Sequence, residues 1–131
     1  MFLLDTNTLI DFFKGQGRVA ERLLATSPQQ LAVSTITVFE LDTGLRKSNA
    51  PETRRRQLAA FTASAQIWPF DARAAAAAAE LRAELERVGT PIGPLDALIA
   101  GAAIAGRATL VSRSLLEFQR VANLAVVDWF D

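Results

Sequence analysis

The 131-residue sequence contains no cysteine and no histidine. Without cysteine there is no disulfide framework, which fits a reducing cytoplasm. Without histidine, the commonest general base, the serine–histidine and cysteine–histidine nucleophile pairs and the usual zinc ligands are all excluded. Any catalysis must therefore use carboxylates, hydroxyls, lysine or arginine. Any metal ion would be bound by oxygen ligands, which favours a hard cation such as Mg²⁺ or Mn²⁺.

Long hydrophobic runs and a net charge are also missing. Half of the residues are hydrophobic, yet no apolar run approaches the roughly 20 residues of a membrane span. We expect a soluble, cytoplasmic protein without a signal peptide or membrane contact. The 14 basic and 14 acidic residues balance, which does not by itself indicate a polyanionic partner. At this length we expect one domain over residues 1–131.

Short β-rich runs alternate with longer helical patterns, which predicts an α/β fold with a parallel sheet covered by helices. The predicted strands are 2–4, 31–34, 66–69, 109–112 and 125–129. The predicted helices are 8–14, 18–25, 37–47, 52–63, 72–88, 95–105 and 115–121. Pro51 suits the first position of the fourth helix, and Asp71 suits the N-cap of the fifth.

An aspartate stands directly after the first predicted strand, in the stretch FLLDTNTLIDFF. Parallel α/β sheets gather their sites at the carboxyl ends of strands, where Asp5 and Ser112 would both lie. The alternative for Asp5, Thr6 and Asn7 is helix capping, because each offers a side-chain oxygen to the free N–H groups of a starting helix. The two roles can coexist.

Asp96 is the only charged residue between Gly89 and Gly106, in a helix that is otherwise apolar on every face. Such a helix is expected to be buried. A buried, ionised carboxylate costs several kcal/mol unless it is paired or bound to a metal. No lysine or arginine lies between Arg87 and Arg107 to neutralise it locally. The alternative is a favourable interaction with the positive end of the helix.

Two glutamates extend this pattern. Glu40 is surrounded by apolar residues, with a capping box formed with Thr37 as the alternative. Glu117 lies on a short predicted helix, where a solvated surface role is the alternative. Asp5, Glu40, Asp96 and Glu117 can nevertheless converge on one edge of the sheet. Two unit charges about 4 Å apart repel by roughly 4 kcal/mol at an effective dielectric of about 20, so converging carboxylates require a cation.

Three stretches, LLDTNTLIDFF, STITVFELDTGLRK and the region from WPFDARA to SLLEF, resemble the PIN-domain ribonucleases, most closely the VapC-type toxins of bacterial toxin–antitoxin systems. The most specific signal is the Asp-Thr-Asn after the first strand combined with G-x-P-I-G-P-x-D at residues 89–96. The resemblance implies a three-layer α/β/α PIN-like fold around a central parallel sheet. It also implies a Mg²⁺- or Mn²⁺-dependent endoribonuclease acting on tRNA or another structured RNA, a cognate antitoxin and a homodimer.

The resemblance also implies roles for individual residues. Asp5, Glu40 and Asp96 match the core acidic residues of the family, and Glu117 matches the fourth. Asp5 and Asp96 would hold the metal, and Glu40 would position or deprotonate the attacking water. Glu117 and Ser112 would complete the site.

Two residues are expected to support Asp5, and one stretch of the sequence departs from the family pattern. Thr6 and Asn7 would orient Asp5 through hydrogen bonds. Family members commonly have Thr-Asn-Asn or Thr-Arg-Asp where this chain has Ser112-Arg113-Ser114, so Ser114 replaces an amide or a carboxylate near a second metal position. This departure keeps open a catalytically weakened PIN-like module that binds RNA or protein.

Basic residues are sufficient for an RNA partner once the site is set aside, because 14 basic residues then face 10 acidic ones. Arg46, Lys47 and Arg113 are the predicted RNA contacts, with residues 54–56 as further candidates. Ordinary solvated helix faces are the alternative for each. Apolar helix residues such as Leu23, Leu24, Leu58 and Phe61 would serve either the core or a protein partner.

Two other enzyme classes also place an aspartate after the first strand of a parallel sheet. Haloacid-dehalogenase-like phosphatases need a second aspartate two positions on, where this chain has Asn7, and a later lysine. Phosphate-accepting receiver domains need a lysine near the last strand. The lysines of this chain are Lys14 and Lys47, so both classes are disfavoured.

Overall fold

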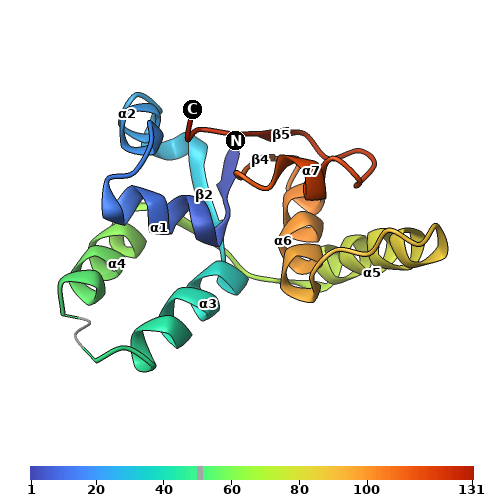
Figure 1. Ribbon diagram of the computed structural model, residues 1–131, viewed down its shortest axis with the longest axis horizontal. Coiled ribbons are helices and arrows are strands. Elements are labelled where there is room, and N and C mark those ends of the chain that lie inside the picture. The colour runs from blue at the N-terminus through green and yellow to red at the C-terminus, as the bar shows by residue number, and fades with distance from the viewer. Residues whose placement is uncertain (50–51) are drawn as a thin grey trace.

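One all-parallel sheet organises the protein, whose computed structural model describes residues 1–49 and 52–131. The strands are β1 (Phe2–Leu4), β2 (Leu31–Ser34), β3 (Gln66–Trp68), β4 (Thr109–Val111) and β5 (Val126–Val127). They lie in the order β3-β2-β1-β4-β5, so β1 is central (Figure 1). Phe2 is paired with Leu31 on one side and with Thr109 on the other.

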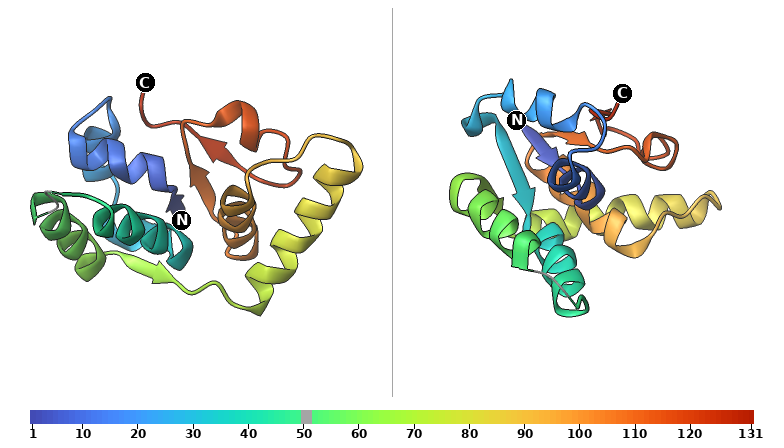
Figure 2. Two further views of the ribbon diagram at one scale, coloured as in Figure 1. Left: turned by 60° about the horizontal axis from the view of Figure 1, so that its bottom comes forward. Right: turned by 60° about the vertical axis from the view of Figure 1, so that its left-hand side comes forward.

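Helices cover both faces of this sheet. Their bounds are α1 (Thr6–Lys14), α2 (Val19–Leu24), α3 (Thr35–Arg46), α4 (Glu52–Ser64), α5 (Ala72–Arg87), α6 (Pro94–Ala105) and α7 (Leu115–Phe118), with a short 3-10 turn η1 (Pro28–Gln30). The left view of Figure 2 shows the strands between the group α1 to α4 and the group α5 to α6. The predicted three-layer α/β/α fold is confirmed.

The alternation of side chains along the strands explains the two layers, because successive strand residues point to opposite faces. Leu3 and Leu110 pack against side chains of α5 and α6. Leu4 and Val111, the next residues in the same strands, pack against side chains of α1 to α4. All four side chains are fully buried, as expected of a parallel sheet covered on both faces.

Helices α5 and α6 approach each other closely at Gly101. A Cβ atom placed on Gly101 would lie only 2.6 Å from the Cβ of Ala78. The alanine-rich sequence of α5 supplies the opposite surface, with Ala74 and Ala78 buried. The prediction that the apolar helix around Asp96 is buried is confirmed for its core face, from Ala97 to Ala103. This packing fixes α6, and with it Asp96, against the sheet.

Helix α3 begins earlier than predicted. Ser34 is the N-cap, and its Oγ accepts a hydrogen bond from the N–H of Ile36 at 3.1 Å. The helix therefore starts at Thr35, and Thr37 lies inside it. The capping box of Thr37 with Glu40, considered as an alternative, is wrong. By contrast, Asp71 caps α5 as predicted, because its Oδ1 accepts from the N–H of Ala74 at 2.9 Å.

Other element bounds are shorter than the sequence indicated. Strand β4 ends at Val111, so Ser112 follows the strand instead of ending it. Strand β5 covers two residues of the predicted 125–129, because Asp128 turns the chain by accepting a hydrogen bond from the N–H of Phe130 at 2.7 Å. Helix α7 is a single turn. The prediction for Pro51 lies outside the described residues, and the single-domain organisation stays a prediction.

Of the four apolar helix residues considered for a core or a partner, three lie in the core and one is exposed. Leu23, Leu58 and Phe61 are buried, whereas Leu24 is 78% exposed.

Among residues 1–49 and 52–131, none of the helices has the length and apolar character that a membrane span requires.

Candidate active site

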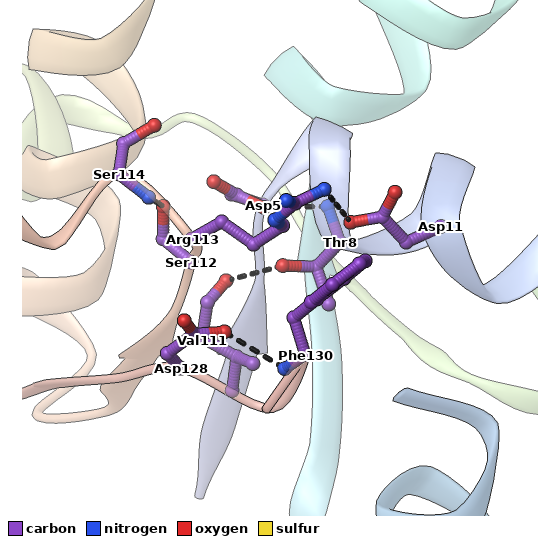
Figure 3. Close-up of polar contacts among 9 residues, drawn as sticks. All are labelled: Asp5, Thr8, Asp11, Val111, Ser112, Arg113, Ser114, Asp128 and Phe130. Atoms are coloured by element: carbon purple, nitrogen blue, oxygen red, sulfur yellow. Dashed lines mark hydrogen bonds and ion pairs between the residues drawn. The ribbon is translucent and has the colours of Figure 1, made fainter. Parts of the chain in front are cut away.

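Asp5 is held at the carboxyl end of the central strand. Its N–H donates to the carbonyl of Val111 at 3.1 Å, which continues the pairing of β1 with β4. Its side chain caps α1, accepting from the N–H of Thr8 at 2.8 Å. The Thr8 hydroxyl donates to Val111 O at 3.0 Å and ties α1 to β4 (Figure 3). Asp5 is 4% exposed. The capping alternative is thus confirmed, and the site role of Asp5 stays a prediction.

The surroundings of Asp5 favour its protonated form. Burial raises the pKa of Asp5, and the nearby charge of Asp11 raises it further. Hydrogen bonds from Ser112 and Thr8 act in the opposite direction and lower it. An aspartate with a raised pKa in a packed site gains most from a nearby positive charge.

Asp96 and Glu117 are neighbouring carboxyl groups. Burial, followed by the charge of Glu117 and a hydrogen bond with it, raises the pKa of Asp96 from 3.8 to about 6. The Oε1 atom of Glu117 accepts from the N–H of Gly93 at 3.1 Å, which joins α7 to the start of α6. A Cβ on Gly93 would lie 3.2 Å from Oδ2 of Asp96, so glycine leaves room for this carboxylate.

All four predicted carboxylates belong to one electrostatic cluster. The charges of Asp5 and Glu40, as well as that of Glu117, raise the pKa of Asp96. Because such effects require proximity, three carboxylates lie in the neighbourhood of Asp96: Asp5 at the N-cap of α1, Glu40 on α3 and Glu117 on α7. None of the ion pairs formed by the described residues includes any of the four.

Thr6 holds Glu40, a role that differs from the predicted one. The Thr6 hydroxyl donates to Oε1 of Glu40 at 2.6 Å and lies 3.4 Å from Oγ1 of Thr37. Asp5 is instead held by Thr8 and Ser112. Thr8 was not singled out in the sequence, although its position three residues after a capping aspartate was a usable signal. Asn7 is exposed on α1.

Ser112 and Arg113 follow β4 beside Asp5. Ser112 is fully buried, and its Oγ accepts from the N–H of Ser114 at 2.9 Å. Nη1 of Arg113 lies 3.5 Å from Oδ2 of Asp11, and its guanidinium carbon lies 3.5 Å from the centre of the Phe130 ring. Figure 3 shows Arg113 reaching from the turn after β4 towards Asp11 on α1. Asp11, a 5% exposed carboxylate, was missed; its only signal was a charge within LIDFF.

The other two predicted RNA contacts lie on the surface near the end of α3. Arg46 pairs with Asp42 at 3.2 Å and remains well exposed. Lys47 is exposed at the C-cap. Neither belongs to the carboxylate cluster, and their contact with RNA stays a prediction.

The donor set fits a divalent cation held by few protein ligands. Within the described part of the chain, no group of three or more carboxylates is arranged to hold a metal ion. Mg²⁺, however, is usually bound by one or two carboxylates and keeps several waters. Asp5 and Asp96, both with raised pKa values and neither in an ion pair with another described residue, suit such a two-carboxylate site.

An all-parallel sheet between two helical layers, with unneutralised carboxylates beyond the carboxyl end of its central strand, defines an α/β protein with an acidic site suited to a divalent cation. The family model described as "PIN domain" matches residues 2–124. The tRNA(fMet)-specific endonuclease VapC of Salmonella typhimurium is 35% identical over 128 residues, which cover 98% of this chain and 97% of the relative.

Solved structures agree with this match. The crystal structure of DNA-bound VapBC from Salmonella typhimurium superposes with a TM-score of 0.91 at 36% identity, covering 98% of this chain and 97% of that chain. A toxin–antitoxin complex from Klebsiella pneumoniae superposes with a TM-score of 0.79 at 28% identity, covering 100% and 99%. The chain therefore belongs to the PIN-domain family and, within it, to the VapC group.

Proposed function

We propose that this chain is an endoribonuclease toxin of the VapC type. It hydrolyses phosphodiester bonds in a structured RNA such as tRNA, depends on Mg²⁺ or Mn²⁺, and is neutralised by a cognate antitoxin. The observation that carries this proposal is the electrostatic effect of Asp5, Glu40 and Glu117 on Asp96, in a cluster that forms no ion pair with any residue in 1–49 or 52–131. The name of the Salmonella relative, a tRNA-specific endonuclease, supports the substrate class.

In this proposal each site residue has a separate task. Asp5 and Asp96 hold the cation, which supplies positive charge that favours ionisation of the attacking water and offsets charge developing on the phosphate. Glu40, fixed by the hydroxyl of Thr6, orients the water and accepts its proton. Glu117, anchored to the N–H of Gly93, keeps Asp96 in place. Ser112 donates a hydrogen bond to Asp5.

A groove of about 490 Å³ begins at Glu40 and runs among α1, α3 and α4. Lys14 and Arg54 bring positive charge to its lining. Arg54 is held in place, because its Nη1 donates to Gln57 at 2.8 Å and its guanidinium lies 5.5 Å from the ring centre of Phe13. We infer that the RNA backbone next to the cleaved phosphate follows this groove and contacts Lys14 and Arg54.

A second groove, of about 480 Å³, is mostly apolar and lies among α1, α2 and α4. Phe12, Phe13, Leu24 and Phe61 contribute to its lining, and Leu24 is 78% exposed. Apolar surface of this kind is typical of protein–protein contacts. We infer that the antitoxin packs an apolar segment here. The Klebsiella structure, a toxin–antitoxin complex, supports a protein partner.

RNA cleavage by the purified protein tests the proposed function. Structured RNAs are incubated with Mg²⁺ or Mn²⁺, with chelator, and with the Asp5→Asn variant. Asparagine is as good an N-cap as aspartate, so the variant is expected to fold. We expect cleavage that requires the cation and disappears in Asp5→Asn. Cleavage that survives chelator, or full activity of a folded Asp5→Asn protein, would contradict the proposal.

The same assay separates the nuclease from a PIN-like module that has lost turnover, since the module would bind RNA and leave it intact. As an RNA-cutting toxin the protein would act in the cytoplasm. The homodimer remains a prediction, which sedimentation of the isolated chain would test.

A further inference from the structure

Arg113 joins three separate segments of the chain beside the carboxylate cluster. It stands in the turn after β4, its Nη1 lies 3.5 Å from Oδ2 of Asp11 on α1, and its guanidinium stacks 3.5 Å from the ring centre of Phe130. Asp11 is almost fully buried, whereas about half of the Arg113 side chain remains exposed. Arginine suits this arrangement because its planar group can pair with a carboxylate and stack on a ring at the same time.

The Phe130 ring is itself fixed. The backbone N–H of Phe130 donates to Oδ1 of Asp128 at 2.7 Å, and the backbone carbonyl of Phe130 accepts from the N–H of Arg18 at 2.8 Å. Gly17 has a φ of +63°, and a Cβ there would lie 2.5 Å from Cδ2 of Phe130. The ring therefore occupies space that exists only because residue 17 is glycine. A ring held on several sides restricts the guanidinium stacked against it.

The turn that carries Arg113 is also in contact with Asp5. Ser112 directly precedes Arg113, accepts the N–H of Ser114 at 2.9 Å and lowers the pKa of Asp5 by hydrogen bonding. Val111, which precedes Ser112, accepts the backbone N–H of Asp5 at 3.1 Å. Arg113 is also the ion-pair partner of Asp11, whose charge acts on Asp5. Displacing Arg113 would thus loosen the turn that holds Asp5 and leave a buried negative charge nearby.

We propose that Arg113 is a positioning residue: clamped between Asp11 and Phe130, it fixes the turn at residues 112–114 and, through the adjoining Val111 and Ser112, the orientation of Asp5. This inference rests on the proposed nuclease function for its kinetic consequence, but its structural consequence stands apart from it. It assigns Phe130 a part in the site, although that residue lies outside the carboxylate cluster. It also differs from the predicted role of Arg113 as a simple phosphate contact.

The test compares Arg113→Ala and Phe130→Leu with Arg22→Ala. Arg22 donates to the carbonyls of Asp128 and Asp131, so its loss removes an arginine contact to the same segment after β5 without removing either of the contacts that Arg113 makes with Asp11 and Phe130. The double variant Asp11→Asn/Arg113→Ala removes both charges and guards against misfolding caused by an unpaired Asp11. The measurements are kcat and KM for RNA cleavage, and hydrogen–deuterium exchange at the amide of Ser114.

We expect Arg113→Ala and Phe130→Leu to lower kcat about tenfold or more with KM unchanged. Combining them should cost little beyond either alone, because they disrupt one unit. Exchange at Ser114 should accelerate in both variants, and in the double variant with Asp11→Asn. Arg113→Lys, which keeps the charge, should recover part of kcat, and Arg22→Ala should match the wild type in kcat and in Ser114 exchange.

Three outcomes would overturn the proposal: unchanged Ser114 exchange in Arg113→Ala, a loss confined to KM as expected for a phosphate contact, or an equal loss of kcat in Arg22→Ala. If the wild-type protein cleaves no RNA, the proposed function fails while the Ser114 exchange still decides whether the clamp orders the turn.

Discussion

The hydroxyl of Thr6 donates a 2.6 Å hydrogen bond to Oε1 of Glu40, 34 positions further along the chain. Thr6 directly follows Asp5, so two adjacent residues serve two carboxylates of the cluster: one provides a carboxylate and the other holds one. This contact is testable because valine has nearly the same shape as threonine. Replacing Thr6 with valine removes the donor and keeps the branched side chain.

We expect Thr6→Val to lower kcat for RNA cleavage by about tenfold or more, because Glu40 loses its fixed orientation. The free energy of unfolding should fall by only about 1 kcal/mol. Thr62→Val is the matched control, since the Thr62 hydroxyl bonds to Leu58 O within α4. Wild-type kcat in Thr6→Val would show that Glu40 does not depend on this bond.

The raised pKa of Asp96 predicts how stability varies with pH in the absence of a cation. The folded protein keeps a proton on Asp96 up to about pH 6, whereas the unfolded chain loses it near its ordinary value of about 4. The native state therefore binds more protons between these values, and stability falls as pH rises through this window. Asp96 is half-buried, so solvent screening reduces the effect to the order of 1 kcal/mol.

Thermal unfolding of the cation-free protein between pH 4.5 and 7.5, a range of about three pH units around this window, checks this sign. Asp96→Asn should flatten the decline in Tm, and adding Mn²⁺ at neutral pH should raise the Tm of the wild type more than that of the variant. Identical pH profiles for the two proteins would refute the assignment of a raised pKa to Asp96.

The groove that begins at Glu40 predicts a salt-dependent contribution to RNA binding. In an Asp5→Asn background, which prevents cleavage, Lys14→Gln/Arg54→Gln should weaken RNA binding and reduce the slope of log affinity against log salt by about 1.5. Arg82→Gln is the control, because Arg82 pairs with Glu86 on α5, away from the groove. An equal slope in the two variants would exclude the groove as the RNA path.

The apolar groove among α1, α2 and α4 predicts that a substitution there will abolish inhibition by the antitoxin without affecting folding or RNA cleavage. Leu24→Asp places a charge on a side chain that is 78% exposed, so folding and RNA cleavage should be retained. Inhibition by the co-expressed antitoxin should be lost, because burying the new charge at the interface is costly. Val88→Asp charges another exposed apolar side chain, at the end of α5, and should remain inhibited. Full inhibition of Leu24→Asp would place the antitoxin elsewhere.

Two helical glycines are expected to respond in opposite ways to substitution by alanine, because only one of them lies at the close contact between α5 and α6. Gly101→Ala should lower the free energy of unfolding by about 1–3 kcal/mol, because the new methyl group meets Ala78. Gly44→Ala, in α3, has no atom within 4 Å of the new Cβ and should raise it by about 0.5–1 kcal/mol. Denaturant titration measures both. A neutral Gly101→Ala would mean that the helices can separate without cost.

Local patterns were sufficient to predict the layers of this fold and to single out Asp96 as an unusual carboxylate. Residues 2–4 and 109–111 alternate between two buried faces, and Asp5 and Asp71 occupy helix starts that their chemistry favours. Asp96 was identifiable because a lone charge in an apolar helix needs a reason. These signals lie within short stretches of sequence, so the rest of the structure was not needed to interpret them.

The missed features depend on contacts between distant segments. Ser34 and Thr37 are both acceptable helix caps, and the pairing of Ser34 with Trp68 in the sheet fixes the start of α3. The Arg113 guanidinium stacks on the ring of Phe130, and no local sequence pattern connects these two residues. Such choices are made by tertiary packing, and a single sequence does not encode them in any short window.

The central position of β1 has a consequence for synthesis. Thr8, which helps to hold Asp5, bonds to Val111, 103 positions further along the chain, and Ser112 reaches Asp5 from the same turn. Asp5 leaves the ribosome long before these partners do. If the protein acts as proposed, a nascent polypeptide therefore lacks a complete catalytic site until translation has passed Glu117, and fragments released earlier would leave the surrounding RNA uncut.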